Sequence, residues 1–240
     1  MKKWTKLRRY PRIIVVAVTS LTAIGVLAAC SATKQVSDVK PVGGFLPQPA
    51  LLTKGQSGQA ALTYRSPQMT SGMYDKVILD PVTLWTGANS PLNNRPAEEQ
   101  QALAETFHKD VYDAISKECQ MVTETGPNTL RIRLALVDAE ESYPVLNTIS
   151  TYIPQAHVVT MLSNYAFNDG TGIFAGSATA EGFAMDSQTG ALLWEGVDER
   201  AGHNALGTDT LKSWDDVDNA FVAWSEEFRK RLKALGICQH

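Results

Sequence analysis

The sequence predicts an α+β fold in which one mixed, largely antiparallel sheet carries two long helices packed on one face. Two apolar stripes with helical spacing, over residues 96–117 and 213–236, predict the helices. Short apolar or alternating runs bounded by turn residues predict the strands. A late hairpin signal predicts antiparallel pairing, and one strand–helix–strand unit predicts a parallel pair.

The first predicted unit is strand, helix, strand. Residues 76–82 are a short apolar run closed by Pro81, which is typical of a buried strand. The helix begins near Pro96, where Glu98 and Glu99 suit the positive end of the helix dipole, and it runs to about Lys117. A strand over 120–124 follows, and a right-handed crossover makes the two strands parallel.

The next predicted strands form antiparallel pairs. Over 130–137, leucine and isoleucine alternate with Arg131 and Arg133, which indicates a half-buried strand with a basic outer face. Residues 173–185 are rich in alanine and glycine, and residues 186–190 have hairpin chemistry before a strand over 191–197. Close packing against the small residues is expected.

Two segments have an ambiguous pattern, and a third segment is predicted to form the last helix of the fold. Residues 143–154 lie between prolines with spacing compatible with a short helix, and residues 157–167 suit either helix or strand. Ser213 and Asp216 have capping-box spacing before the last helix. Its apolar stripe comprises Val217, Phe221, Trp224, Phe228, Leu232 and Leu235.

The charge of the chain is unevenly distributed. Residues 1–29 carry six basic residues and no acid, which leaves 16 basic residues against 25 acids and a net charge of −9 for the remainder. Nucleic acids and anionic lipid surfaces require a basic face. We therefore expect no nucleic-acid partner for the folded part.

The N-terminus is predicted to be a cleaved signal peptide, residues 1–29. A basic start to Arg12 precedes an apolar run over 13–29 that ends in Ala28 and Ala29, the three-part form of a secretory signal. The alternative is an uncleaved membrane span. The run is near the short limit for crossing a hydrocarbon core of about 30 Å.

The cleavage site has a more specific form. Leu27-Ala28-Ala29-Cys30 resembles the lipobox of bacterial lipoproteins, in which the cysteine thiol receives a diacylglycerol before the peptidase cuts in front of it. Two or three acyl chains such as palmitate hold a protein stably, whereas one holds marginally. The resemblance implies lipidation of Cys30. With Ser31 next, it also implies sorting to the outer membrane, with the soluble part facing the periplasm.

The remaining chain is predicted to form two regions. Residues 30–72 contain Pro41, Pro47, Pro49 and Pro67 without a sustained period, which indicates a lipid-anchored tether and extended segment. Residues 73–238 are predicted to form the periplasmic α+β domain.

Cys119 and Cys238 form an even pair for an oxidising compartment. Each follows a predicted helix. If the helices pack side by side in the same direction, the cysteines come within disulfide reach. The alternative is two unpaired thiols.

Several motifs of the chain are distinctive when taken together. They are Met73–Val82, Pro144–Pro154, Asp186–Gly190, Asp198–Gly202 and the helix that follows Trp214. These motifs resemble a bacterial lipoprotein family catalogued as domain of unknown function 3313. The resemblance covers roughly Phe45 to Gly236 and implies a periplasmic lipoprotein domain. It implies no activity and transfers no site residue.

No catalytic, cofactor-binding or metal site is predicted. The glycines over 170–176 precede a strand rather than a helix, which argues against a phosphate loop. No second His or Cys lies at metal spacing from His108, His157, His203 or His240, and we expect His108 to be solvated.

An acidic cluster and one polar segment are harder to interpret. Asp198, Glu199 and Arg200 could form an acid–base cluster with Glu181. We favour charge pairing across strands, between Glu181 and Arg131, Arg133 or Arg200. Residues 147–152 mix polar and apolar side chains, so a binding loop and a cover for a sheet edge are equally compatible with them.

The leading functional hypothesis is a non-enzymatic envelope interaction or assembly module. It would be held to the outer membrane by acyl chains on Cys30 and would contact an envelope protein partner. The alternatives are a lipid-anchored hydrolase acting on a cell-wall or glycan substrate, and a small-molecule binding domain. A hydrolase needs a concave pocket with convergent polar groups. A partner module needs an exposed apolar patch, for which residues 143–167 are the candidate.

Overall fold

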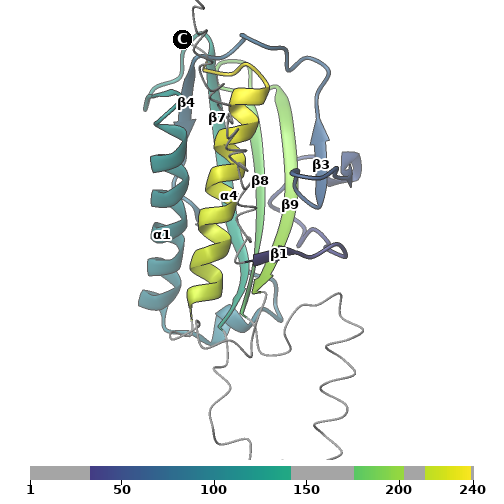
Figure 1. Cartoon of the computed structure of the whole chain (residues 1–240), viewed down its shortest axis with the longest axis vertical. Coiled ribbons are helices and arrows are strands. Elements are labelled where there is room, and N and C mark those ends of the chain that lie inside the picture. The colour runs from purple at the N-terminus through teal and green to yellow at the C-terminus, as the bar shows by residue number, and fades with distance from the viewer. Residues whose placement is uncertain (1–32, 142–175, 203–213, 239–240) are drawn as a thin grey trace, which may run out of the picture. The chain divides into compact units, whose positions relative to one another are not determined.

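The computed structural model describes residues 33–141, 176–202 and 214–238, and these contain one nine-stranded sheet and two long helices (Figure 1). The hydrogen-bonded strand order is β2-β3-β9-β8-β7-β4-β6, and in addition β1 pairs with β9 and β5 with β7. The α+β class and the mixed sheet are thus confirmed. The strands are β1 Thr33–Gln35, β2 Thr53–Lys54, β3 Leu62–Arg65, β4 Lys76–Leu79, β5 Thr83–Leu84, β6 Gln120–Met121, β7 Thr129–Glu140, β8 Ser177–Asp186 and β9 Leu192–Gly202.

The predicted strand–helix–strand unit is present as β4, α1 (Ala97–Ile115) and β6. Strand β4 pairs in parallel with β6 on one side and with β7 on the other, as the crossover rule predicts. Helix α1 carries Glu98 and Glu99 in its first turn. These carboxylates lie at the positive end of the helix dipole, so they stabilise the start of the helix.

The centre of the sheet is the antiparallel series β7, β8 and β9. Leu130, Ile132 and Leu134 of β7 are nearly fully buried, whereas the side chains of Arg131 and Arg133 are 40% and 48% exposed. The basic outer face predicted for β7 is confirmed. Both β7 and β9 extend beyond the predicted strands.

The sheet also draws on residues before Met73. Strands β1 and β3 both pair antiparallel with β9, and β2 pairs with β3. The extended segment expected over 30–72 therefore supplies strands to the sheet from Thr33 onward. The chain divides into two compact units, Met1–Cys30 and Ser31–His240.

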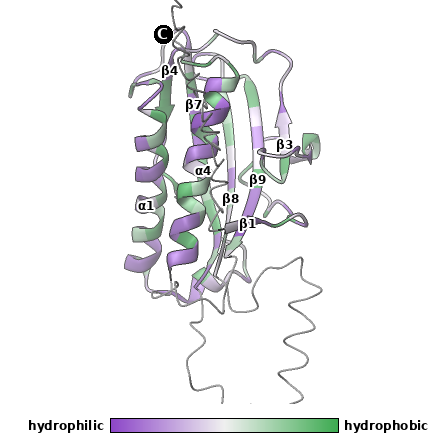
Figure 2. Cartoon of the chain, in the orientation of Figure 1, coloured by the Kyte–Doolittle hydropathy of each residue, from purple (hydrophilic) through white to green (hydrophobic). Residues whose placement is uncertain are grey.

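One apolar cluster joins the helices to the sheet. Phe107 of α1 stacks on Phe221 of α4 (Asp215–Ala234) with ring centroids 4.8 Å apart, and Trp224 lies 5.3 Å from Phe107. The same cluster contains the even-numbered residues of β7 from Leu130 to Leu136. Apolar and polar residues alternate along both helices (Figure 2). One stripe of each helix is therefore buried while its other faces remain polar.

A second apolar cluster lies on the opposite face of β8 and β9. Phe183 and Val197 point away from the helix cluster because neighbouring residues of a strand face opposite sides. Val39, Phe45 and Leu46 pack on them from the chain between β1 and β2. This segment, residues 36–52, is the cover of the second face, and it includes a 3-10 turn at Pro49–Leu51. We refer to it as the N-terminal cover.

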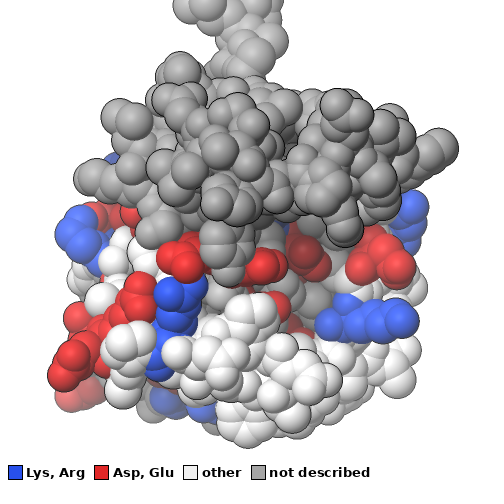
Figure 3. Space-filling model, turned by 90° about the horizontal axis from the view of Figure 1, so that it is seen from below, with Lys and Arg blue, Asp and Glu red and all other residues white. Residues whose placement is uncertain are grey.

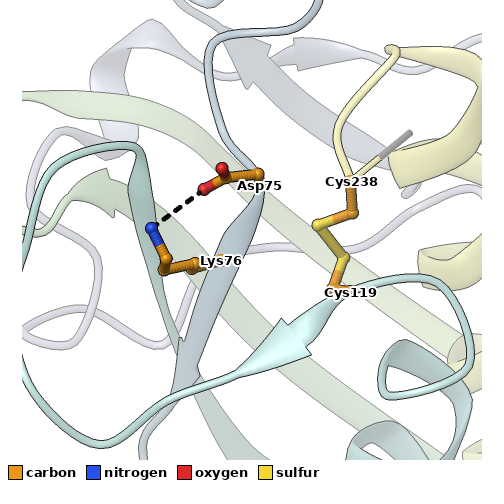
Figure 4. The surroundings of a disulfide bond; sticks show 4 residues. All are labelled: Asp75, Lys76, Cys119 and Cys238. Atoms are coloured by element: carbon orange, nitrogen blue, oxygen red, sulfur yellow. Dashed lines mark ion pairs between the residues drawn. A yellow bond between two sulfur atoms is a disulfide. The ribbon is translucent and has the colours of Figure 1, made fainter. Parts of the chain in front are cut away.

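Cys119 and Cys238 form a disulfide with 4.8 Å between their Cα atoms. Helices α1 and α4 end near the same place, and Gly236, at a φ of 65°, turns the chain after α4 toward Cys238. Figure 4 shows the bridge beside the start of β4, where Asp75 and Lys76 form an ion pair of 3.5 Å. The Cys238 amide donates to the Tyr74 carbonyl at 2.9 Å.

The capping box predicted for Ser213 and Asp216 is not tested, because Ser213 lies outside the described residues. The carboxylate of Asp216 accepts a hydrogen bond from the Gly176 amide at 2.9 Å, so it tethers α4 to the start of β8. Ser213, Cys30 and the segments 143–154 and 157–167 lie outside the described residues. Among the helices that the structure describes, none has the length and apolarity needed to cross a membrane.

Replacing both Cys119 and Cys238 with serine is expected to lower the free energy of unfolding by about 2–5 kcal/mol, because the bridge closes a long loop in the unfolded chain. Chemical denaturation of both proteins, with and without reductant, measures the difference. Reductant should destabilise the wild-type chain and leave the double variant unchanged. Equal midpoints for the oxidised wild type and the variant would contradict the prediction.

Candidate functional site

A cavity of about 180 Å³ lies between α4 and the helix-facing side of β3, β7, β8 and β9. It is partly open, and most of its wall is apolar or aromatic. Neither the cavity nor its lining was predicted from the sequence. The side chains that define it include Met69, Phe107, Trp194, Trp224, Phe228 and Leu235.

Small residues on the central strands leave this space. Ala180, Gly182 and Ala184 of β8 border the cavity together with Gly196 of β9. A Cβ atom at Gly196 would lie 2.5 Å from Cζ2 of Trp194, so the glycine allows the indole to lie flat along the sheet. The close packing expected against the small residues of β8 is found at Gly182, where Leu134 and Trp194 approach the backbone.

Trp194 is fixed by two further contacts. Its indole Nε1 donates to the Thr63 hydroxyl on β3 at 2.9 Å, and its ring meets Phe228 of α4 edge-on with centroids 5.6 Å apart. A buried indole N–H requires an acceptor, and the neighbouring strand supplies it. The cavity wall therefore joins β3, β9 and α4.

A buried polar network borders the cavity at Asp198. Its carboxylate accepts hydrogen bonds from the Ala61 amide and the Trp224 indole, both at 2.7 Å, and from the side chain of Gln35. Burial raises the pKa of Asp198, while these hydrogen bonds and the nearby Arg200 act in the opposite direction. The network holds β1, β3, β9 and α4 together.

Arg200 completes this network. Its Nε lies 3.4 Å from Asp198 Oδ2, and its Nη2 donates to Glu227 of α4 at 2.7 Å. Both Asp198 and Arg200 are less than 10% exposed. A buried charge is tolerated when it is paired and hydrogen-bonded. One guanidinium therefore contacts both acids beside the cavity and offsets one of their two charges.

Two more carboxyl groups are buried on the opposite face of the sheet, under the N-terminal cover. Glu181 and Glu195 are 1% and 0% exposed, and each accepts one backbone hydrogen bond, from Val42 at 2.5 Å and from Gln48 at 2.7 Å. Burial raises the pKa of both groups, and the proximity of Glu195 raises that of Glu181 further. The cover is thus fastened by two carboxyl groups that lack a basic partner among the described residues.

The charge pairing expected for Glu181 is wrong. Arg131 forms a two-fold hydrogen bond with Asp80, and Arg133 lies 3.4 Å from the same carboxylate. Strand β7 pairs with β4 as well as with β8, and Asp80, directly after β4, is the carboxylate that both arginines contact. Arg200 points to the helix face, opposite to Glu181.

The predicted acid–base cluster is only partly assembled. Asp198 and Arg200 are brought together, whereas Glu199 and Glu181 face the other side of the sheet. Two carboxylates on opposite faces of one sheet cannot act on one substrate bond. The alternation of β9 already separates Asp198 from Glu199, whereas the face of Glu181 relative to Asp198 depends on a strand register set over a long distance.

The histidine and metal expectations were tested only in part. His108 was expected to be solvated, but it is half-buried, with its ring 6.2 Å from that of Tyr112 and its Nδ1 shielded from solvent. In residues 33–141, 176–202 and 214–238, no group of three or more His, Cys, Asp or Glu side chains is arranged to hold a metal ion. His157, His203, His240, the segment 147–152 and most of the 170–176 glycine run lie outside the described residues.

The sequence pattern of one protein family spans most of this fold. The model of the family described as protein of unknown function DUF3313 matches residues 43–228, from the N-terminal cover to Phe228 of α4. The chain belongs to this family. The match confirms the resemblance seen in the sequence motifs. No curated protein matches this DUF3313 chain by sequence.

Several solved structures resemble the DUF3313 chain distantly. A PelC dodecamer from Paraburkholderia phytofirmans has 10% identity and a TM-score of 0.39, over 74% of this chain and 96% of that one. Protein XCC0632 from Xanthomonas campestris has 11% identity and a TM-score of 0.39, over 72% and 91%. A minor lipoprotein from Acinetobacter baumannii has 7% identity and a TM-score of 0.32, over 67% and 94%. At these values no functional property is transferred.

Replacing Glu181 with glutamine is expected to stabilise this DUF3313 protein at neutral pH. Burial in the folded state raises the pKa of Glu181 above its ordinary 4.5. Protonation of Glu181 therefore contributes its full stabilisation of the fold below pH 4.5, and this contribution is lost as the pH rises through the pKa of the folded state. In the variant, the neutral side-chain amide still accepts the hydrogen bond from the Val42 amide. It avoids this loss of stability, which amounts to roughly 1–3 kcal/mol.

Denaturation curves between pH 4.5 and 8 measure the effect. The wild-type chain should lose more stability with rising pH than Glu181→Gln. The control is Glu140→Gln, which removes an exposed carboxylate from the adjacent strand β7 and should leave the pH dependence unchanged. A Glu181→Gln curve parallel to that of the wild type would refute the assignment.

Proposed function

We propose that this DUF3313 chain is a non-enzymatic outer-membrane lipoprotein. Acyl chains on Cys30 would anchor it, and an α+β body with both long helices on one face of its sheet would act in the periplasm as an envelope interaction or assembly module. One observation carries the proposal. The first described strand, β1, begins at Thr33, three residues after the cysteine of a lipobox-like motif.

The redox state of the body supports an extracytoplasmic compartment. A disulfide between Cys119 and Cys238 persists in an oxidising environment such as the periplasm, and it is rare where thiols are kept reduced. The remaining cysteine of the chain, Cys30, is the one that the lipobox assigns to acylation. All three cysteines thus have a role in the proposed lipoprotein.

The arrangement of charges supports a role other than nucleic-acid binding or glycan hydrolysis. On the face shown in Figure 3, acidic and basic side chains are interspersed, and the chain after residue 29 has a net charge of −9. A hydrolase acting on glycan needs two carboxylates on either side of one bond. Asp198 is hydrogen-bonded within the core, and Glu181 lies across the sheet from it.

The small-molecule binding alternative is favoured by one specific observation, the apolar cavity beneath α4. Such a cavity with a few polar groups is typical of a ligand site. Anchoring and ligand binding are compatible, since they use separate parts of the chain.

A Cys30→Ala variant tests the anchor. Without the thiol there is no acylation, so the exported protein should leave the outer-membrane fraction, and intact-mass measurement should lack the acyl chains that the wild type carries. Ser31→Ala serves as the control for the neighbouring position and should stay in the membrane fraction. If Cys30→Ala still fractionates with the outer membrane after export, the anchor is elsewhere.

Crosslinking in intact cells tests the interaction role. An amine-reactive crosslinker applied to cells expressing the full chain should join it to one or a few envelope proteins, at fixed lysines that peptide mapping identifies. Mature chain displaced from the membrane by Cys30→Ala should lose these products if the partner is membrane-bound. A wild-type chain that yields only monomer at every crosslinker dose would overturn the interaction role without affecting the anchor.

A further inference from the structure

We infer that the cavity beneath α4 binds a single-chain amphiphilic anion, such as a medium-chain fatty acid. Its apolar chain would occupy the cavity, and its carboxylate would meet Arg231 and Arg65. This inference goes beyond the proposed anchor and does not depend on it, since the cavity lies within residues 58–235 and involves no residue near Cys30.

The apolar part of the ligand follows from the cavity wall. Its lining is dominated by aromatic and aliphatic side chains, among them Trp194, Phe228 and Leu232. Protein interiors are close-packed, so a space of about 180 Å³ is large for a void in a core. A dry apolar cavity of about 150 Å³ accepts a benzene-sized guest. The space therefore suits one short apolar chain and is too small for the two chains of a phospholipid.

The charge of the ligand follows from two arginines in the cavity wall. Arg231 of α4 donates from Nε to the Gly58 carbonyl at 2.6 Å and from Nη2 to the Ser57 carbonyl at 3.4 Å. Arg65 at the end of β3 donates to the Met69 carbonyl at 2.7 Å. These main-chain contacts orient both guanidinium groups. Among the described residues, no carboxylate lies within 4.0 Å of either group.

The other arginines of the described chain behave differently. Each of them lies within 4.0 Å of a carboxylate; they are Arg95, Arg131, Arg133, Arg200 and Arg229. Asp198 and Glu227, the acids beside the cavity, both pair with Arg200 rather than with Arg65 or Arg231. The cavity thus combines an apolar interior with two arginines that form no ion pair among the described residues, which complements a carboxylate at the end of an apolar chain.

Photocrosslinking of the full chain in isolated envelopes tests the inference. The probe is a medium-chain fatty acid that carries a diazirine on its chain, and labelled peptides are mapped by mass spectrometry. We expect saturable labelling of the β9 and α4 peptides that contain Trp194 and Phe228, with competition by the unlabelled acid. The methyl ester of the probe, which lacks the charge, should label them less.

Three variants sharpen this test. Arg231→Gln should weaken labelling about tenfold, as expected when one charge-assisted hydrogen bond is lost. Ala180→Leu fills the cavity and should abolish labelling. Lys230→Gln is the matched control, because it removes an exposed positive charge from the same helix outside the cavity, and it should label like the wild type.

The outcome separates the ligand site from the anchor. Cys30→Ala should retain the labelling whatever its membrane fraction, because the cavity residues are unchanged. Label spread over exposed peptides, or labelling that neither Arg231→Gln nor Arg65→Gln reduces, would overturn the inference. The arginine variants change the edge of the cavity rather than the core, so they remain informative even if Ala180→Leu does not fold.

Discussion

Strand β8 is buried on both faces, and the rest of the fold depends on this constraint. Ala178, Ala180 and Ala184 face the helix cluster, whereas Glu181 and Phe183 face the N-terminal cover. Burial of apolar surface is the main force that stabilises a fold, so the centre of this sheet needs a layer on each side. On one side, the apolar cluster contains buried residues of α1 and α4. The chain between β1 and β2 supplies the layer on the other side, which makes residues before Met73 part of the structural core.

The sequence predicts those elements whose pattern is local. Helices α1 and α4 and strand β7 carry a period of 3.6 or 2. Strand β4 is a short apolar run, and the β8–β9 hairpin has its own turn signal, so each of these can be recognised within one element. The N-terminal cover has no such period, because irregular chain and one 3-10 turn form it. Its role becomes visible only when Val39 and Leu46 are placed on Phe183 and Val197.

The candidate site could not be predicted for a related reason. Its residues come from β3, β7, β8, β9 and α4, and their meeting depends on strand registers that long-range pairing sets. The small residues of β8 were a usable signal for close packing. That Trp194 would also lie over Gly182 of β8 required the β8–β9 register. The same limit explains why Glu181 was assigned an arginine partner, when it accepts from a main-chain amide of the cover.

The bridge between Cys119 and Cys238 has a consequence for the integrity of the molecule. It encloses β6, β7, β8, β9 and α4 in one covalent ring of chain. A protease that cuts one peptide bond anywhere between the two cysteines opens this ring without dividing the protein into two molecules. After such a cut, the piece that bears Cys30 still holds the remainder by a covalent bond. Under the proposed anchor, a nicked body would stay attached to the membrane until a reductant released it.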